Sequence, residues 1–237
     1  MKRKSSWLLI LMMISFLLTF IGCSTPNSTS ELTAPETSPA VNIVFSAASN
    51  NWVATFTPGP DDGKDAMVQS RVPDLNAGNY NRFMAIDWTW SGVPGAIRSL
   101  IEFDLSDIPD DASITSALLS LYAWDGSSPH STLSGSNACW LQRITSSWAE
   151  DTVTWNNQPT TTTQNQVTLP ASTSPTQNYP DIDVTDMVLD MIADPSAGYG
   201  MMIRLQTEAY YRNMSFCSSD HTNSALRPKL VVTFTTP

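Results

Sequence analysis

Ile114-Thr115-Ser116-Ala117-Leu118-Leu119-Ser120-Leu121-Tyr122 is the stretch that decides the fold, because apolar side chains recur in it at every second position. Successive side chains of a β-strand point to opposite faces of its sheet, so Ala117, Leu119 and Leu121 share one face. The stretch therefore predicts a strand with one face in a hydrophobic core.

The same alternation continues outward from this stretch in other short runs. Leu230, Val232 and Phe234 form the inner set of a strand near the C-terminus. The runs 83–90 and 97–105, joined by a turn at 91–95, predict a hairpin. Clusters of Gly, Pro, Asn, Asp and Ser separate the runs, which is typical of antiparallel strands.

One short helix is predicted late in the chain. Thr185 is its candidate N-cap, Met187 and Met191 belong to its apolar face, and Pro195 follows its end. Strands and helices do not alternate, which argues against a parallel sheet. We therefore predict an all-β fold, an antiparallel, jelly-roll-like β-sandwich in which the short helix plugs one end.

The first 22 residues have the pattern of a lipoprotein signal peptide. Three basic residues at 2–4 precede an apolar run, 7–21, that is too short for a comfortable membrane span. The run leads into Phe20-Ile21-Gly22-Cys23, which resembles a lipobox, so we predict that Cys23 is lipidated. An ordinary signal peptide with an incidental cysteine is the alternative.

Residues 23–50 are predicted to comprise the lipidated cysteine and a disordered tether, because their first part is rich in Ser, Thr, Pro and Glu. The folded domain then spans 51–237. The protein is expected to be exported and lipid-anchored at the cell surface. In a Gram-negative source this would be the outer membrane, since Ser24 rather than Asp follows Cys23.

The chain is acidic, with 12 Lys and Arg against 22 Asp and Glu and a formal net charge of −10. Removing the signal peptide, which holds three of the basic residues and none of the acids, lowers the net charge to −13. Affinity for nucleic acid depends on clustered Lys and Arg, and the sequence has no such stripe. We therefore predict no nucleic-acid partner and membrane contact through the lipid anchor only.

Cys139 and Cys217 remain once Cys23 is assigned to the lipid. A disulfide between them is one alternative, because an exported domain meets an oxidising environment. Two separate buried thiols acting as small hydrophobes are the other.

A series of different motifs is distributed along the predicted domain. They are Gly63–Ala66, Asn76–Tyr80, Arg98–Leu105, Ile114–Tyr122, Ser146-Ser-Trp-Ala-Glu-Asp-Thr-Val-Thr-Trp-Asn-Asn-Gln-Pro159, Asp183–Asp186, Gly198–Gly200, Ser218–Asp220 and Arg227–Val232. Their order and spacing resemble the DNRLRE-type family, also classed as carbohydrate-binding module family 96. The resemblance implies a β-sandwich module that binds polysaccharide, including acidic algal polysaccharide. Glu102 departs from the basic residue that relatives often carry at its position.

Aromatic rings stack on the apolar faces of sugars, so tryptophans are candidate ligand-binding residues. Trp88 and Trp90 share one face of the first hairpin strand, and Tyr122 and Trp124 share the face opposite the core set of their strand. These four form a platform if they are exposed; partial cover near the end of a sandwich is the alternative. Trp148 and Trp155 lie inside a family motif and are assigned structural roles.

The basic residues divide into two groups. One group lies in strand motifs, where pairing of arginine with carboxylates is expected: Arg98, Arg143, Arg204, Arg227 and Lys229. Outside these motifs we predict ligand contacts for Lys64, Arg71, Arg82 and Arg212, if the ligand carries carboxylates. Isolated solvated charges are the alternative.

Asp61, Asp62 and Asp65, beside Gly63, offer oxygen ligands for Ca²⁺, although ordinary turn chemistry also explains them. Ca²⁺ is the one candidate cofactor, and no other is predicted.

No catalytic residue is predicted. His130 and His221 have no spacing that suggests a histidine metal cluster or a Ser-His pair. Tyr210, Tyr211, Arg212 and His221 have the residue types of a lyase-like set, but solvated loop residues explain them as well. We predict a non-catalytic surface lipoprotein that binds polysaccharide. A structural or adhesive surface protein is the first alternative, and a polysaccharide lyase or hydrolase ranks last.

Overall fold

The computed structural model describes residues 41–48 and 50–237, which belong to one compact unit. The predicted signal peptide, Cys23 and residues 24–40 lie outside the described residues. Among the residues described, no helix is both long and apolar enough to cross a membrane.

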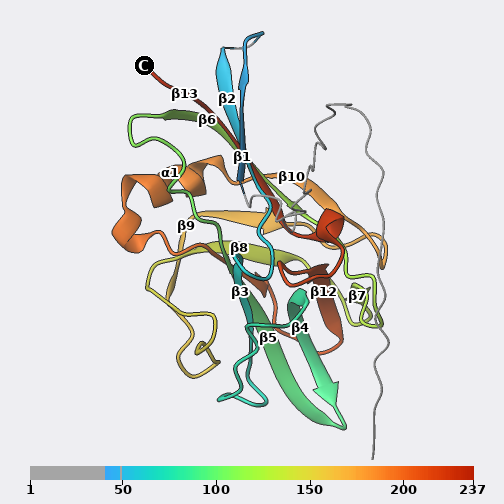
Figure 1. Ribbon diagram of the computed structural model, residues 1–237. Coiled ribbons are helices and arrows are strands. Elements are labelled where there is room, and N and C mark those ends of the chain that lie inside the picture. The colour runs from blue at the N-terminus through green and yellow to red at the C-terminus, as the bar shows by residue number, and fades with distance from the viewer. Residues whose placement is uncertain (1–40, 49) are drawn as a thin grey trace, which may run out of the picture. The chain divides into compact units, whose positions relative to one another are not determined.

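Strands dominate the described part (Figure 1). The strands are β1 Val41–Ser46, β2 Asn51–Phe56, β3 Lys64–Gln69, β4 Arg82–Trp90, β5 Val93–Glu102, β6 Ser113–Leu121, β7 Ser131–Thr132, β8 Cys139–Ile144, β9 Thr161–Leu169, β10 Tyr179–Asp183, β11 Met201–Leu205, β12 Arg212–Cys217 and β13 Lys229–Thr235. The helices are α1 Thr185–Ala193 and the short 3₁₀ turns η1 Pro195–Ala197 and η2 Ser224–Leu226.

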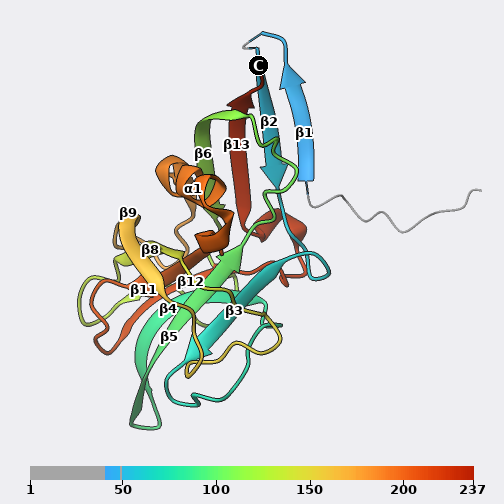
Figure 2. The same cartoon turned by 90° about the vertical axis from the view of Figure 1, so that its left-hand side faces the viewer.

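The strands form two antiparallel sheets. The first is five-stranded in the order β1-β2-β13-β6-β10. The second is eight-stranded in the order β7-β12-β4-β5-β11-β8-β9, with β3 paired to β5 as well. Figure 2 shows the first sheet above the second, with α1 beside β6 and β9. The predicted all-β sandwich is confirmed.

The second sheet forks at β5. Ile97 pairs with both Ile86 of β4 and Gln69 of β3, and Ile101 pairs with both Met201 of β11 and Asp65 of β3. A residue in a sheet has one neighbour on each side, so β3 follows one edge of β5 while β4 and β11 succeed each other along the other edge. Beyond the fork the β4–β5 hairpin continues as an arm with its own two faces.

The core lies between the two sheets and has the predicted alternation. Ala117, Leu119 and Leu121 of β6 are fully buried, and so are the three apolar residues predicted for β13. They pack in one cluster with side chains of the second sheet, including Phe83 of β4 and Phe216 of β12. Each large side chain buried in this way stabilises the fold by about 1.5–3 kcal/mol.

The helix α1 bridges the two sheets, since it contacts both β6 and β9. Met187, Val188 and Met191 are its buried face, as the spacing predicted. The predicted cap is wrong: Thr185 is the first helical residue, and Val184, the N-cap residue, has no side-chain capping bond. Asp183 takes that role, because its Oδ1 accepts hydrogen bonds from the Thr185 N–H (3.0 Å) and hydroxyl (2.6 Å).

Two segments differ in detail from the sequence prediction. β1, Val41–Ser46, lies in the range predicted as tether, and it pairs with β2 along its whole length. The predicted hairpin is present, but its turn is Ser91–Gly92 alone. Both turn residues have positive φ, 53° and 80°, which matches the right-handed twist of the flanking strands and keeps the loop short.

The segment 145–160 covers the outer face of the second sheet near β3 and β5. Trp148 and Val153 pack with Leu100 in a second apolar cluster, and Trp155 lies against it. The Trp148 indole N–H donates to Tyr199 O (2.9 Å), and Glu150 Oε1 accepts from the Asp65 N–H (2.9 Å). The two motif tryptophans therefore have the structural positions assigned to them.

Candidate functional site

One face of the β4–β5 arm carries a partly exposed aromatic surface on an apolar base. Alternation along β4 places Met84, Ile86, Trp88 and Trp90 on one face, away from Phe83 and the main core. Met84 and Ile86 are buried with Ile97, whereas Trp88 and Trp90 are only half-buried. The arm therefore holds two indole rings on a rigid apolar base.

Two adjoining hollows open over this face, and together we call them the tryptophan groove. One, of about 370 Å³, includes Trp88, Trp90, Pro129 and Asn213 in its wall. The other, of about 290 Å³, is lined by the residues Met67, Gln69, Arg71, Val72, Leu75, Tyr80, Arg82, Met84, Ile86, Trp90, Ile97 and Ser128. The hollows share Ile86, Trp90 and Ser128, so they lie side by side.

The loop wall of the groove is fixed by His130. Its Nδ1 accepts from the Ser215 N–H at 2.9 Å, and its Nε2 lies 2.9 Å from Gln177 O, which requires a neutral ring with the proton on Nε2. Burial lowers the pKa of His130, in agreement with a neutral ring. His130 therefore anchors the loop rather than serving as a solvent-exposed acid or base.

Both groove arginines lie over tryptophan rings. The Arg71 guanidinium is 5.6 Å from the Trp90 ring centroid, and that of Arg82 is 5.5 Å from the Trp124 ring. Within residues 41–48 and 50–237 neither arginine has a carboxylate partner within 4.0 Å. Stacked guanidinium groups without a counter-charge remain available to an acidic ligand.

The other predicted ligand residues lie elsewhere. Lys64 Nζ is 2.6 Å from Glu102 and stacks on Trp148, so its charge is already paired. Arg212 of β12 lies opposite Asp87 of β4 in the strand register. Its side chain is on the face of β12 opposite that of its neighbour Asn213, which lines the groove. Tyr122 and Trp124 line neither hollow of the groove, although Trp124 reaches it through Arg82.

The structure separates the roles of the predicted calcium ligands. Asp61 is exposed, and Asp62 accepts a hydrogen bond from the Gly59 N–H, which is ordinary turn chemistry. Asp65 is buried, and its Oδ2 accepts from the Ser219 N–H at 2.7 Å. The ligand atoms of these three aspartates form no group within 4.8 Å of one another.

Asp65 shares its surroundings with two other carboxyl groups. Burial raises the pKa of Asp65 to about 7, and the nearby Asp220 and Glu150 contribute in the same direction. Burial also raises the pKa of Glu150 and of Asp220. The cluster holds the segment 145–160 and the turn at 218–221 against β3, so we assign it a structural role.

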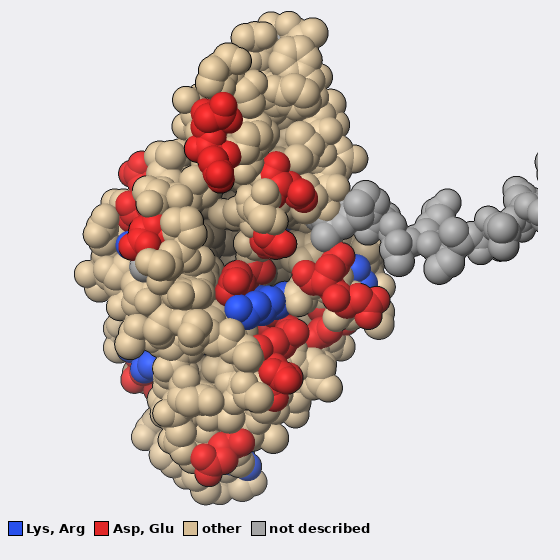
Figure 3. Space-filling model, turned by 60° about the vertical axis from the view of Figure 1, so that its left-hand side comes forward, with Lys and Arg blue, Asp and Glu red and all other residues tan. Residues whose placement is uncertain are grey.

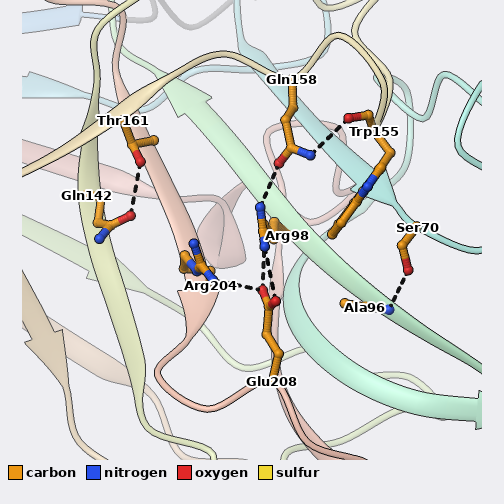
Figure 4. A network of polar contacts seen from close by, with 9 residues as sticks. All are labelled: Ser70, Ala96, Arg98, Gln142, Trp155, Gln158, Thr161, Arg204 and Glu208. Atoms are coloured by element: carbon orange, nitrogen blue, oxygen red, sulfur yellow. Dashed lines mark hydrogen bonds and ion pairs between the residues drawn. The ribbon is translucent and has the colours of Figure 1, made fainter.

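Several other polar groups are paired within the fold. Figure 4 shows Arg98 and Arg204 pointing toward Glu208, at 2.7 Å and 3.5 Å. Arg143 lies 3.7 Å from Asp190, so the expected pairing with carboxylates is confirmed for these three arginines. Arg227 instead donates to His221 O at 2.8 Å. On the face shown in Figure 3 the few Lys and Arg side chains lie among more numerous Asp and Glu side chains.

The two cysteines of the described domain do not form a disulfide. Cys139 and Cys217 are free, buried thiols on β8 and β12, which are not neighbours in the sheet, so the structure has the second of the two sequence alternatives. Burial raises the pKa of both thiols, that of Cys217 to about 11.

The fold separates two members of the lyase-like set. His221 is buried just after Cys217, the last residue of β12, whereas Arg212 lies at the other end of that strand, about 17 Å away along the strand.

Sequence reasoning missed the walls of the groove. Tyr80 and Ser128 come from loops, and Asn213 comes from β12, so no spacing along the chain connects them with Trp90. Tyr211 is a further aromatic neighbour, since its ring lies edge-on to Trp88 at 5.1 Å. Only the fold brings these residues together.

Comparison with known proteins gives one positive result. The family model described as carbohydrate-binding module family 96 matches residues 59–234. The match spans β3 to β13 and every residue of the tryptophan groove. No curated protein matches the chain.

Proposed function

Since the chain belongs to carbohydrate-binding module family 96, we propose that it is a non-catalytic lipoprotein that binds polysaccharide in the tryptophan groove at the cell surface. The observation that carries the assignment to the groove is the pair of half-buried tryptophans on one face of β4, beside two arginines that have no carboxylate partner in the described part of the chain.

The groove has the chemistry of sugar recognition. A flat indole offers apolar area to the C–H face of a pyranose, while polar neighbours take its hydroxyl groups. Trp88 and Trp90 supply that area, and Gln69 and Asn213 are among the polar lining residues. An open groove on an arm, rather than an enclosed pocket, suits a chain of sugars that continues beyond the contact.

The arginines favour a polysaccharide that carries carboxylate groups. A guanidinium binds a carboxylate through two parallel hydrogen bonds, which fixes orientation and is stronger than a neutral hydrogen bond. The acidic chain as a whole opposes an acidic ligand, but charges more than about 8 Å away are largely screened at physiological salt. Arg71 and Arg82 therefore supply local positive charge for an acidic ligand.

Affinity gel electrophoresis of the chain from Ser24 onward tests the proposal, with a polyuronate in one gel and a neutral glucan in another. Trp88→Ala and Trp90→Ala are expected to migrate as if polyuronate were absent. Trp140→Ala is the matched control, because Trp140 lies on β8, away from the groove, and it should be retarded like the wild type. Equal retardation of all three variants would remove the groove from the function.

A further inference from the structure

At the end of β12 three side chains with metal-binding atoms converge. The donor atoms of Asp125, Cys217 and His221 all lie within 4.8 Å of one another. His221 Nε2 is 3.3 Å from Asp125 Oδ1. Cys217 and His221 are buried, whereas the Asp125 side chain is 57% exposed, so the cluster is closed on one side and open to solvent on the other.

The turn after β12 aims the imidazole at the other two groups. The His221 N–H donates to Ser218 O at 3.2 Å, which folds the chain back over the strand end. The Nδ1 atom faces the backbone of Asn223: it accepts from the Asn223 N–H at 3.2 Å and lies 3.3 Å from the carbonyl oxygen of the same residue. In the neutral ring the proton is therefore on Nε2, toward Asp125. Binding of an ion at Nε2 moves that proton to Nδ1, where the Asn223 carbonyl oxygen accepts it, which is the usual arrangement of a metal-bound histidine.

We propose that Asp125, Cys217 and His221 bind a zinc ion. One sulfur, one nitrogen and one oxygen donor suit a borderline-soft ion, and they do not suit Ca²⁺ or Mg²⁺, which prefer oxygen alone. In a tetrahedral zinc site, donor atoms of these kinds lie about 3.3–3.6 Å apart. The 3.3 Å between Nε2 and Oδ1 already has this value, and Cys217 Sγ lies within 4.8 Å of both atoms.

The fourth position of the ion would face solvent on the Asp125 side, where water or a ligand atom completes the coordination. Coordination requires the thiolate, so the Cys217 proton passes to solvent when the ion binds, and the charge of the ion compensates for the burial of the sulfur. Cys217 of β12 lies opposite Arg82 of β4 in the strand register, so the site is at the Arg82 end of the tryptophan groove. The proposal stands independently of sugar binding.

Titration of the chain from Ser24 onward, made without a histidine tag, with Co²⁺ and then Zn²⁺ tests the site. We expect one equivalent of Co²⁺ to produce thiolate-to-metal absorption in the near ultraviolet, and Zn²⁺ to abolish that absorption by displacement. Zn²⁺ should also slow alkylation of Cys217 while leaving Cys139 unaffected. Absence of the absorption, or equal alkylation with and without Zn²⁺, would overturn the proposal.

Variants distinguish the site from adventitious binding. Cys217→Ser should lose the absorption, and Cys139→Ser, which changes the other buried thiol, should keep it. Asp125→Asn is the safest variant for folding, because its side chain is exposed, and it should weaken Zn²⁺ binding at least about tenfold. Unchanged affinity in Asp125→Asn, or absorption retained in Cys217→Ser, would show that these residues do not hold the ion.

Discussion

Arg71 and Arg82 have the same chemical type as Arg212, yet only the first two line the groove. We expect Arg71→Gln and Arg82→Gln each to weaken binding to a polyuronate about tenfold, equivalent to about 1.4 kcal/mol, because each loses a charge-assisted contact. Binding to a neutral glycan should change little. Calorimetric titration with the two ligands measures the difference.

Arg212→Gln is the matched control for these variants, because Arg212 lies on the opposite face of β12 from the groove. It removes the same charge from the molecule as a whole. A loss of affinity as large as that of the groove variants would mean that net charge, and not the groove, governs binding.

Asp65 gives the domain a pH-dependent stability. Its pKa is about 7 in the folded state against 3.8 ordinarily, so the folded form holds a proton between these values that the unfolded form has lost. Stability from this group is therefore full below about pH 4 and is lost as the pH rises to about 7. In an Asp65→Asn variant the amide side chain resembles the protonated acid, and its oxygen is still able to accept the hydrogen bond from the Ser219 N–H.

We therefore expect Asp65→Asn to melt at a higher temperature than the wild type at pH 8, and the advantage to shrink as the pH is lowered to 5. Its size at pH 8 should be about 1–3 kcal/mol. Asp61→Asn, which changes an exposed carboxylate, should show no such trend. Parallel melting curves for Asp65→Asn and wild type at every pH would contradict the assignment of a protonated Asp65.

At the scale of elements, the two-residue turn of the β4–β5 arm offers a paired test. Gly92 has a φ of 80° and no atom within 4 Å of an added Cβ, so Gly92→Ala should destabilise the fold through backbone strain alone, by about 1 kcal/mol. Ser91 has a φ of 53°, which Asn tolerates better, so Ser91→Asn should stabilise slightly. Chemical denaturation measures both, and equal signs would contradict the turn geometry.

Alternation predicted the named strand runs near 83–90, 97–105, 114–122 and 230–234, because it reports which face is buried. It succeeded for Ala117, Leu119 and Leu121, where one face meets the core, and for the buried face of α1. It failed at β1, where Ile43, Val44 and Phe45 are all more than a third exposed, so no inner set marks the strand. Pairing with β2, rather than burial, holds that segment in the sheet.

The candidate site was only partly predictable. Trp88 and Trp90 could be placed on one face because they are two positions apart on a single strand. The separation of Lys64 from Arg71, and of Arg212 from Arg82, depends on the fork at β5 and on strand pairing over long distances. The grouping of Asp125 with Cys217 and His221 has the same origin, since a loop more than 90 positions earlier meets the end of β12.

For the molecule as a whole, the predicted anchor at Cys23 is tested separately from the domain. In cells fed radiolabelled palmitate, we expect the full-length protein to carry label and to sediment with membranes. Cys23→Ser should lose the label and appear in the soluble fraction, whereas Cys139→Ser should behave as wild type, because that thiol is buried. Label retained by Cys23→Ser would exclude lipidation at this residue.

The position of β13 governs when the domain is able to close. β13 lies between β2 and β6 in the middle of the first sheet, although it is the last strand along the chain. A ribosome must therefore release Lys229–Thr235 before the early and middle strands find their shared neighbour. Until then the first sheet lacks its central strand, so under the proposed export the translocation machinery would receive a chain whose first sheet is incomplete.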